Sequence, residues 1–151
     1  MYNKSNLFDG FEIISFPRLE DLTAIPQGSS GFVYTIFWVT DGREIPFYVG
    51  QTHRFSERIK DYCRAYFKAC TDFRVGNAVS YFQNTKNHCV VLKYKHSDDP
   101  IEEERSLIRD LHLSGMLLLN DLAAYDYNSA KEEEERIIVQ RFCDALMRVS
   151  R

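Results

Sequence analysis

The sequence lacks the signals that mark membrane, secreted and zinc-binding proteins. No apolar run approaches the roughly 20 residues that a membrane-spanning helix needs, and residues 1–10 do not follow the charged-then-apolar order of a secretory signal. The four cysteines form no CxxC pair and have no zinc-like spacing to the four histidines. We therefore expect a cytoplasmic protein without membrane contact, whose thiols stay reduced.

A general surplus of positive charge is also missing, because the net charge is −3 and the pI is about 5.8. This excludes a globally basic nucleic-acid coat and leaves a local basic face open. Segment 31–96 carries ten basic and five acidic side chains, whereas segment 97–151 carries seven basic and thirteen acidic ones. The positive field of the chain is therefore concentrated in its middle.

The chain has enough apolar residues for one domain with a substantial core, since 44% of its 151 residues are hydrophobic and 14% are aromatic. Runs of β-branched and aromatic residues predict strands over 32–39, 45–49 and 88–94, with an additional edge strand over 11–16. Helical spacing predicts helices over 55–70, 76–83, 100–113 and 131–149. Together these elements predict an α+β domain with a small antiparallel sheet flanked by helices.

One carboxylate interrupts the apolar side of the third predicted helix. At about 100° per residue, Ile101, Leu107, Ile108 and Leu111 define a buried stripe, and Glu104 falls near its middle. A carboxylate in a core is costly unless it is paired or binds a cation. Two interpretations are open: Glu104 forms a buried salt bridge, or it is a functional carboxylate.

The first predicted helix mixes basic and aromatic side chains. Arg58 lies at the border of its apolar face, where it either extends along that face to solvent or grips phosphate oxygens. The interleaved basic residues form either an ordinary solvated helix face or a contact for a phosphate backbone. The candidates for nucleic-acid binding are Arg54, Lys60, Arg64 and Lys68, with Gly50 added because a glycine permits close backbone approach.

Five short motifs, taken in order, resemble the GIY-YIG nuclease family. They are Phe32-Val33-Tyr34-Thr35-Ile36, Tyr48-Val49-Gly50-Gln51-Thr52, Phe55-x-x-Arg58-x-x-x-Tyr62, Glu104-x-x-Leu107-Ile108 and Leu119-Asn120. Three departures from the family pattern occur. Phe32 stands where a glycine normally opens the first motif, Tyr62 stands where a histidine is common, and the proline often found shortly before the asparagine is absent.

The resemblance implies a three-stranded antiparallel sheet flanked by helices, formed by a nuclease domain over residues 31–122. Residues 1–30 would then be an N-terminal extension packed on this domain, and residues 123–151 a C-terminal loop and amphipathic helix. The implied activity is hydrolysis of phosphodiester bonds in DNA, with RNA as an open second substrate. The implied cofactor is Mg²⁺ or Mn²⁺.

The resemblance also implies a role for each candidate catalytic residue. Tyr34 and Tyr48 correspond to the two motif tyrosines that position or activate water, and Tyr34 is the first candidate for accepting its proton. Arg58 corresponds to the arginine that stabilises charge on the phosphate. Glu104 corresponds to the metal ligand, and Asn120 to the asparagine that closes the site.

Two other functions are open. One is a nucleic-acid-binding module on the same scaffold that does not cleave, suggested by Phe32 and by the acidic balance. The other is a protein-interaction domain that uses the acidic C-terminal segment. Since no separate DNA-reading motif is recognisable, sequence specificity would come from the terminal segments 1–30 and 123–151, from a second copy of the chain in a homodimer or from a partner chain, or it would be low.

Overall fold

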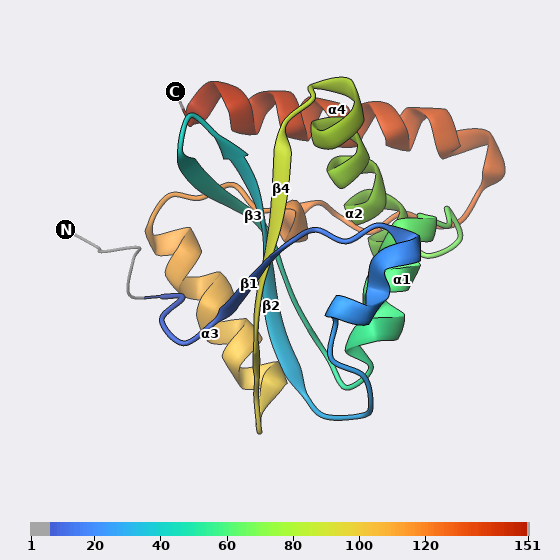
Figure 1. The fold of residues 1–151 in the computed structure, drawn as a ribbon. Helices are drawn as coiled ribbons and strands as arrows, with labels where there is room; N and C mark the ends of the chain where they lie inside the picture. Colours follow the sequence, from blue (N-terminus) through green and yellow to red (C-terminus); the bar gives the residue numbers. More distant parts are fainter. Residues whose placement is uncertain (1–6, 151) are drawn as a thin grey trace.

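β2, which the β-branched and aromatic run of the sequence predicts, is one of the two interior strands of the sheet (Figure 1). The computed structural model describes residues 7–150, so residues 1–6 of the predicted N-terminal extension and Arg151 lie outside the described part. The sheet has four antiparallel strands in the order β1-β4-β2-β3. The strands are β1 (Glu12–Ser15), β2 (Phe32–Thr40), β3 (Arg43–Thr52) and β4 (Cys89–His96).

The expectation of three strands is wrong by one. β1 pairs with β4, with Ile14 opposite Leu92, and forms one edge of the sheet. The apolar run over 11–16 predicts this edge strand, but the family resemblance does not include it. Without β1, the edge of β4 would expose a row of unpaired N–H and C=O groups. Part of the predicted N-terminal extension is therefore integral to the sheet.

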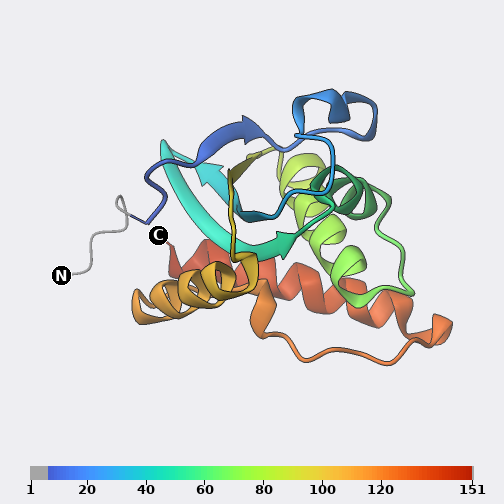
Figure 2. The ribbon, with the colours of Figure 1, turned by 90° about the horizontal axis from the view of Figure 1, so that it is seen from below.

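Helices cover both faces of the sheet (Figures 1 and 2). One face packs against α3, and the other packs against α1 and α2, with α4 against α2. The helices are α1 (Phe55–Arg64), α2 (Cys70–Ser80), α3 (Pro100–Leu113) and α4 (Glu132–Val149). Shorter segments are the 3-10 helices Leu19–Ala24, Leu119–Asp121 and Ser129–Lys131 and the π-helical turn Tyr81–Thr85.

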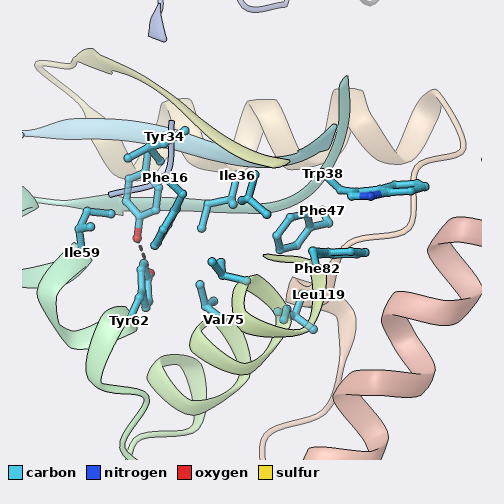
Figure 3. Close-up of a cluster of buried hydrophobic side chains, with 14 of the residues drawn as sticks. Phe16, Tyr34, Ile36, Trp38, Phe47, Ile59, Tyr62, Val75, Phe82 and Leu119 are labelled. Atoms are coloured by element: carbon cyan, nitrogen blue, oxygen red, sulfur yellow. Dashed lines mark hydrogen bonds between the residues drawn. The ribbon is translucent and has the colours of Figure 1, made fainter. Parts of the chain in front are cut away.

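Alternate residues of β2 face two separate cores. Tyr34, Ile36 and Trp38 belong to the larger core, which also contains side chains of α1, α2 and α4 (Figure 3). Val33 belongs to the smaller core, where it meets Val49 and apolar residues of α3. This alternation is the period of two that a strand imposes, and it places the candidate tyrosine on the side of α1 and α2.

The helix predicted over 55–70 is shorter in the structure, and residues 65–69 form a turn before α2. α1 ends after Arg64 because Ala65 adopts a left-handed backbone with φ of 49°. α1 and α2 then pack so closely that a side chain at Gly76 would collide with the carbonyl oxygen of Tyr62 and with Ala65. The chain must turn at this point to bring the second helix back onto the sheet.

The short helix predicted over 76–83 begins earlier in the structure, because α2 starts at Cys70. Its residues form the second half of α2 and the beginning of the π-helical turn. The sequence pattern misses the start of α2 because it assigns Cys70 to the preceding helix. Within residues 7–150, no helix has the length and apolarity that crossing a bilayer requires.

α3 has the predicted bounds but a shorter buried stripe. Leu107 and Leu111 are buried, as predicted, whereas Ile101 is 54% exposed. The smaller core contains Val33 and Val49 and reaches the middle and last turns of α3 but not its first turn. Ile101 was therefore a wrong prediction from the helical wheel, which treats all turns of a helix alike.

Candidate active site

Tyr34 and Gly50 lie directly opposite each other in the ladder between β2 and β3. The Tyr34 ring is fully buried and lies across Gly50. A Cβ atom at residue 50 would collide with the phenol group of Tyr34. A side chain at residue 50 and a tyrosine ring in this position therefore exclude each other. Gly50, a predicted nucleic-acid-binding residue, is itself buried, and in this structure it makes room for Tyr34.

Tyr62 completes a cluster of three phenols with Tyr34 and Tyr48. The hydroxyls of Tyr34 and Tyr62 are hydrogen-bonded inside the core (Figure 3), and the Tyr48 ring meets the Tyr62 ring edge-on at 6.0 Å between centroids. Burial raises the pKa of all three phenols, and the Arg58 charge lowers each pKa to a smaller extent. In this environment the three phenols are protonated at neutral pH.

A β-bulge orients Tyr48. Tyr48 is opposite Ile36 of β2, and the next pair is Phe37 with Pro46, so Phe47 is the extra residue of β3. A bulge redirects the neighbouring side chains, and here both Phe47 and Tyr48 contact the larger core. Tyr48 remains partly exposed, unlike Tyr34. It is therefore the motif tyrosine that solvent can reach.

Arg58 extends from α1 toward the phenol cluster and forms an ion pair on the way. Its Nη1 donates to Oδ1 of Asp72 at 2.7 Å, and its guanidinium carbon lies 4.9 Å from the centroid of the Tyr62 ring. The Arg58 side chain is 30% exposed. Arg58 is thus held in one orientation by a carboxylate and a ring face, and it does not simply extend to solvent.

Asp72, the partner of Arg58, is the site residue that the sequence does not indicate. An acidic residue in the first turn of a helix is common because it suits the helix dipole, so Asp72 does not stand out in the pattern. The structure buries it between α1 and α2. Burial raises the pKa of the Asp72 carboxyl, and the charge of Arg58 opposes this rise.

Glu104 is partly buried and projects from α3 toward the end of β3. Burial raises the pKa of its carboxyl, while the charge of Arg105 and the backbone amide of Gln51 lower it. Burial is the main cause of the raised pKa of Tyr48, and the charge of Glu104 makes a small further contribution. Across the described residues 7–150, no cationic nitrogen lies within 4.0 Å of the Glu104 carboxylate. The alternative of a buried salt bridge is therefore not what the structure contains.

Asn120 uses both ends of its side-chain amide on the backbone of β3. Its Oδ1 accepts from the N–H of Val49 at 3.0 Å, and its Nδ2 donates to the Val49 carbonyl oxygen at 2.7 Å. β3 is an edge strand, so the amide substitutes for a neighbouring strand at this point. Asn120 thus fixes the backbone between Tyr48 and Gly50, which makes it a positioning residue.

The predicted basic contacts are only partly brought to the site. Arg54 is exposed, and its carbonyl oxygen accepts from the backbone N–H of Arg58 at the start of α1. Lys60 and Arg64 follow Arg58 by two and six positions and therefore point in other directions. Lys68 lies beyond the end of α1, with its Nζ 5.6 Å from the centroid of the Tyr127 ring. Of these candidates, Arg54 is the exposed N-cap residue of α1, one helical turn before Arg58.

The candidate metal ligand is a single carboxylate, that of Glu104. Residues 7–150 contain no group of three or more His, Cys, Asp or Glu side chains that would enclose a metal ion. Mg²⁺ does not need such a cage, because it keeps several waters and often binds through one or two carboxylates and substrate phosphates. Glu104, partly desolvated and without a counter-ion, fits this mode of binding.

No family model, curated protein or solved structure matches the chain. The activity therefore has to be inferred from the side chains themselves. They are the buried, hydrogen-bonded phenols of Tyr34 and Tyr62, the partly exposed phenol of Tyr48, the guanidinium of Arg58 that Asp72 binds, and the carboxylate of Glu104. Such a set can bind a phosphate through the guanidinium and a cation through the carboxylate.

Proposed function

We propose that this protein is a metal-dependent endonuclease of the GIY-YIG type, which hydrolyses phosphodiester bonds in DNA. The observation that carries the proposal is the cluster of three phenols beside Arg58, whose guanidinium carbon lies 4.9 Å from the centroid of the Tyr62 ring. Glu104 extends from α3 toward Gln51 at the end of β3, the strand that also carries Tyr48. A phosphate placed beside Tyr48 would then be bound by the guanidinium, with Glu104 available to hold a cation.

Glu104 would hold one Mg²⁺ or Mn²⁺ through its carboxylate oxygens. A bound cation would neutralise part of the negative charge on the phosphate. Glu104 must be ionised for this role, and its burial opposes ionisation until the cation compensates for the charge. The absence of a cationic nitrogen within 4.0 Å of this carboxylate among residues 7–150 supports a site that is completed by a bound cation.

Arg58 would offset the charge that grows on the non-bridging oxygens of the phosphate. A donor that is already fixed is more effective here than one that must be ordered during the reaction. The Asp72 pair engages one end of the guanidinium, and an arginine fork can bind a second anion with its other nitrogens. Asp72 is then the positioning residue for Arg58.

Tyr34 and Tyr48 would position the attacking water and take part in moving its proton. Tyr48 is partly exposed, whereas Tyr34 is fully buried and hydrogen-bonded to Tyr62. We therefore assign the direct contact with water to Tyr48, with the Tyr34–Tyr62 pair behind it. A phenol acts as a base only if its pKa falls, and the neighbouring charges available for this are Arg58 and the bound cation.

A plasmid nicking assay with Mg²⁺ or Mn²⁺ tests the proposal. Glu104→Gln removes the carboxylate charge at constant shape, and Arg58→Ala removes the guanidinium; each should lower the cleavage rate by about 10² or more. Glu102→Gln, on the exposed side of the same helix, is the matched control and should cleave at the wild-type rate. Full activity in both site variants would exclude this site.

A second function, nucleic-acid binding without cleavage, is favoured by one observation. Arg58 is already paired with Asp72, and the phenols are protonated without a cation. A protein of this kind would bind DNA with strong salt dependence and would leave plasmid intact with every divalent metal. The same assay, run together with a binding measurement on DNA and RNA, distinguishes the two functions and the two substrates.

A further inference from the structure

Two segments that are distant in the sequence form one aromatic surface (Figure 2). The turn between α1 and α2 contributes residues 64–68, and the loop before the last 3-10 helix contributes residues 125–127. The Phe67 ring joins them, because it stacks on the Tyr125 ring at 4.7 Å and meets the Tyr127 ring at 5.6 Å between centroids. The Tyr125 hydroxyl also donates to the Phe67 carbonyl oxygen. The two segments are therefore held together by ring contacts and a hydrogen bond.

Two aromatic side chains of these segments are open to solvent. Tyr66 is 63% exposed and Tyr127 is 52% exposed, whereas Phe67 beneath them is 8% exposed. We refer to residues 64–68 and 125–127 together as the Tyr66–Tyr127 surface. Exposed apolar surface that is grouped in one place is typical of an interaction site.

The exposed charges of the Tyr66–Tyr127 surface are mainly positive. Arg64 and Lys68 are exposed, and neither lies within 4.0 Å of a carboxylate oxygen in the described part of the chain. The Nζ of Lys68 lies 5.6 Å from the centroid of the Tyr127 ring. Asp126 is the acidic residue of the two segments, so they carry two cations and one anion in a protein whose net charge is −3. This local charge favours a polyanion as the partner.

The acidic start of α4 does not cancel this charge. Three of its four glutamates form ion pairs with Arg74 or Arg136 at 3.0–3.9 Å. Among residues 7–150, Glu134 has no such partner, and Lys131, which is equally exposed and unpaired, balances it. The surplus of positive charge on the neighbouring surface therefore remains.

The Tyr66–Tyr127 surface is continuous with the candidate active site. A cavity of about 260 Å³ is lined by Tyr48 and Asn120 of that site and also by Cys70, Arg74 and Ala124. Cys70 and Ala124 lie within two residues of the two segments in the chain. A strand whose reacting phosphate lies beside Tyr48 can therefore continue past the cavity onto the Tyr66–Tyr127 surface.

We propose that the Tyr66–Tyr127 surface binds a single-stranded segment of nucleic acid, with bases stacked on the exposed tyrosines and phosphates beside Arg64 and Lys68. This inference rests on the proposed function and names the form of substrate that the site accepts. Aromatic rings beside cations bind single strands with little sequence preference. The bases of a duplex are already stacked on one another, so they do not reach these rings. The substrate would be DNA with a single-stranded segment next to the cleavage position.

Binding of labelled oligonucleotides to the full chain in EDTA tests the surface without any cleavage step. The probes are a thymidine strand of about 15 nucleotides, within the range that single-strand binders cover, an abasic strand of the same length, and a duplex of the same length. Fluorescence anisotropy measures each Kd. Because one stacked base contributes about 5-fold to 100-fold in affinity, the thymidine strand should bind at least fivefold more tightly than the abasic strand. Equal binding of these two strands would overturn the proposal.

Two variants connect the binding to the exposed rings. Tyr66→Ala and Tyr127→Ala should each weaken binding of the thymidine strand by about tenfold and leave binding of the abasic strand unchanged. Ile13→Ala, which removes an exposed apolar side chain from β1 at the other edge of the sheet from Tyr48, is the matched control and should bind as the wild type does. Thermal unfolding shows whether each variant is folded. Oligonucleotide binding that ignores both tyrosines would leave this surface to a protein partner and overturn the proposal.

Two further variants test the cations. Arg64→Ala and Lys68→Ala should each reduce the slope of log Kd against log salt by about 0.7, the value for one phosphate contact on a single strand. The reduction should be the same for the abasic strand, which keeps its phosphates. Arg43→Ala, exposed and unpaired within the described residues at the turn between β2 and β3, is the matched control. Unchanged slopes in both test variants would overturn the placement of the strand.

The outcomes also separate this inference from the nuclease proposal. Tyrosine-dependent binding of single strands by a protein that never cuts DNA would reject the nuclease and leave the surface standing. Cleavage that depends on Glu104, without tyrosine-dependent binding, would keep the nuclease and reject the surface.

Discussion

The ring of Tyr34 occupies the space that a side chain at Gly50 would need. Gly50→Ala should therefore destabilise the protein by about 1–3 kcal/mol through overpacking, although alanine is normally better than glycine inside a strand. Denaturant unfolding measures the change. In a Tyr34→Ala background the added cost of Gly50→Ala should nearly vanish, because the colliding ring is gone. An equal cost in both backgrounds would contradict the packing relation.

Asp72→Asn should loosen Arg58 and slow the proposed cleavage. The substitution keeps an oxygen acceptor but removes the charge that balances a partly buried guanidinium, and charged hydrogen bonds contribute about 1.5–3 kcal/mol. We expect a loss of that size in the free energy of unfolding, together with a lower kcat. Glu57→Gln, exposed on α1 and only weakly paired with Arg54 at 4.0 Å, should change stability by less than about 0.5 kcal/mol. A stable Asp72→Asn protein with unchanged kcat would show that Arg58 needs no positioning residue.

Asn120→Ala should expose the backbone of Val49 at the edge of the sheet. Two hydrogen bonds are lost, and we expect a destabilisation of about 1–3 kcal/mol with faster hydrogen exchange at the Val49 amide. Asn84→Ala removes a surface amide that bonds only to the Ser80 hydroxyl and should leave that exchange rate unchanged. Loss of cleavage in Asn120→Ala without faster exchange would mean that Asn120 contacts the substrate directly.

The cysteines should react with an alkylating reagent in an order set by exposure and pKa. Cys89 is exposed and should react first, whereas Cys143 is buried and burial raises the pKa of its thiol. Cys63 should react more slowly than Cys70, because burial and the nearby Glu20 raise its pKa and the thiolate is the reactive form. Peptide mass spectrometry of the folded protein measures the order. Alkylation of Cys143 at the rate of Cys89 would show that the larger core opens readily.

Local sequence patterns predicted the sheet well because strand residues have a distinct composition. The run over 32–39 corresponds to Phe32–Thr40, and even Pro46 is accommodated, since it lies at the β-bulge of an edge strand. The break at Ala65 was missed, because alanine is a strong helix former and gives no signal for a left-handed backbone. That break depends on the close packing of two helices, which a local pattern does not contain.

The candidate site likewise has residues that local motifs indicate and residues that only contacts between distant elements reveal. The motifs indicate Tyr48 and Glu104 as candidate site residues, and their roles stay a prediction. Asp72 and the cavity beside Arg74 were not predictable, because each depends on contacts between elements that are distant in the sequence. A helical wheel shows which side of a helix is apolar, but it does not show which polar group the next helix will place there.

The ion pair between Arg74 of α2 and Glu135 of α4 connects the last helix to the rest of the domain. Glu135 belongs to α4, outside residues 31–122, and α4 also contributes Val139, Cys143 and Leu146 to the larger core. A protein shortened at residue 122 would retain every family-like motif, yet it would leave a buried cation without its counter-charge and uncover the core. Recombinant versions meant for biochemistry should therefore extend through the last helix, which is part of the domain and not a detachable tail.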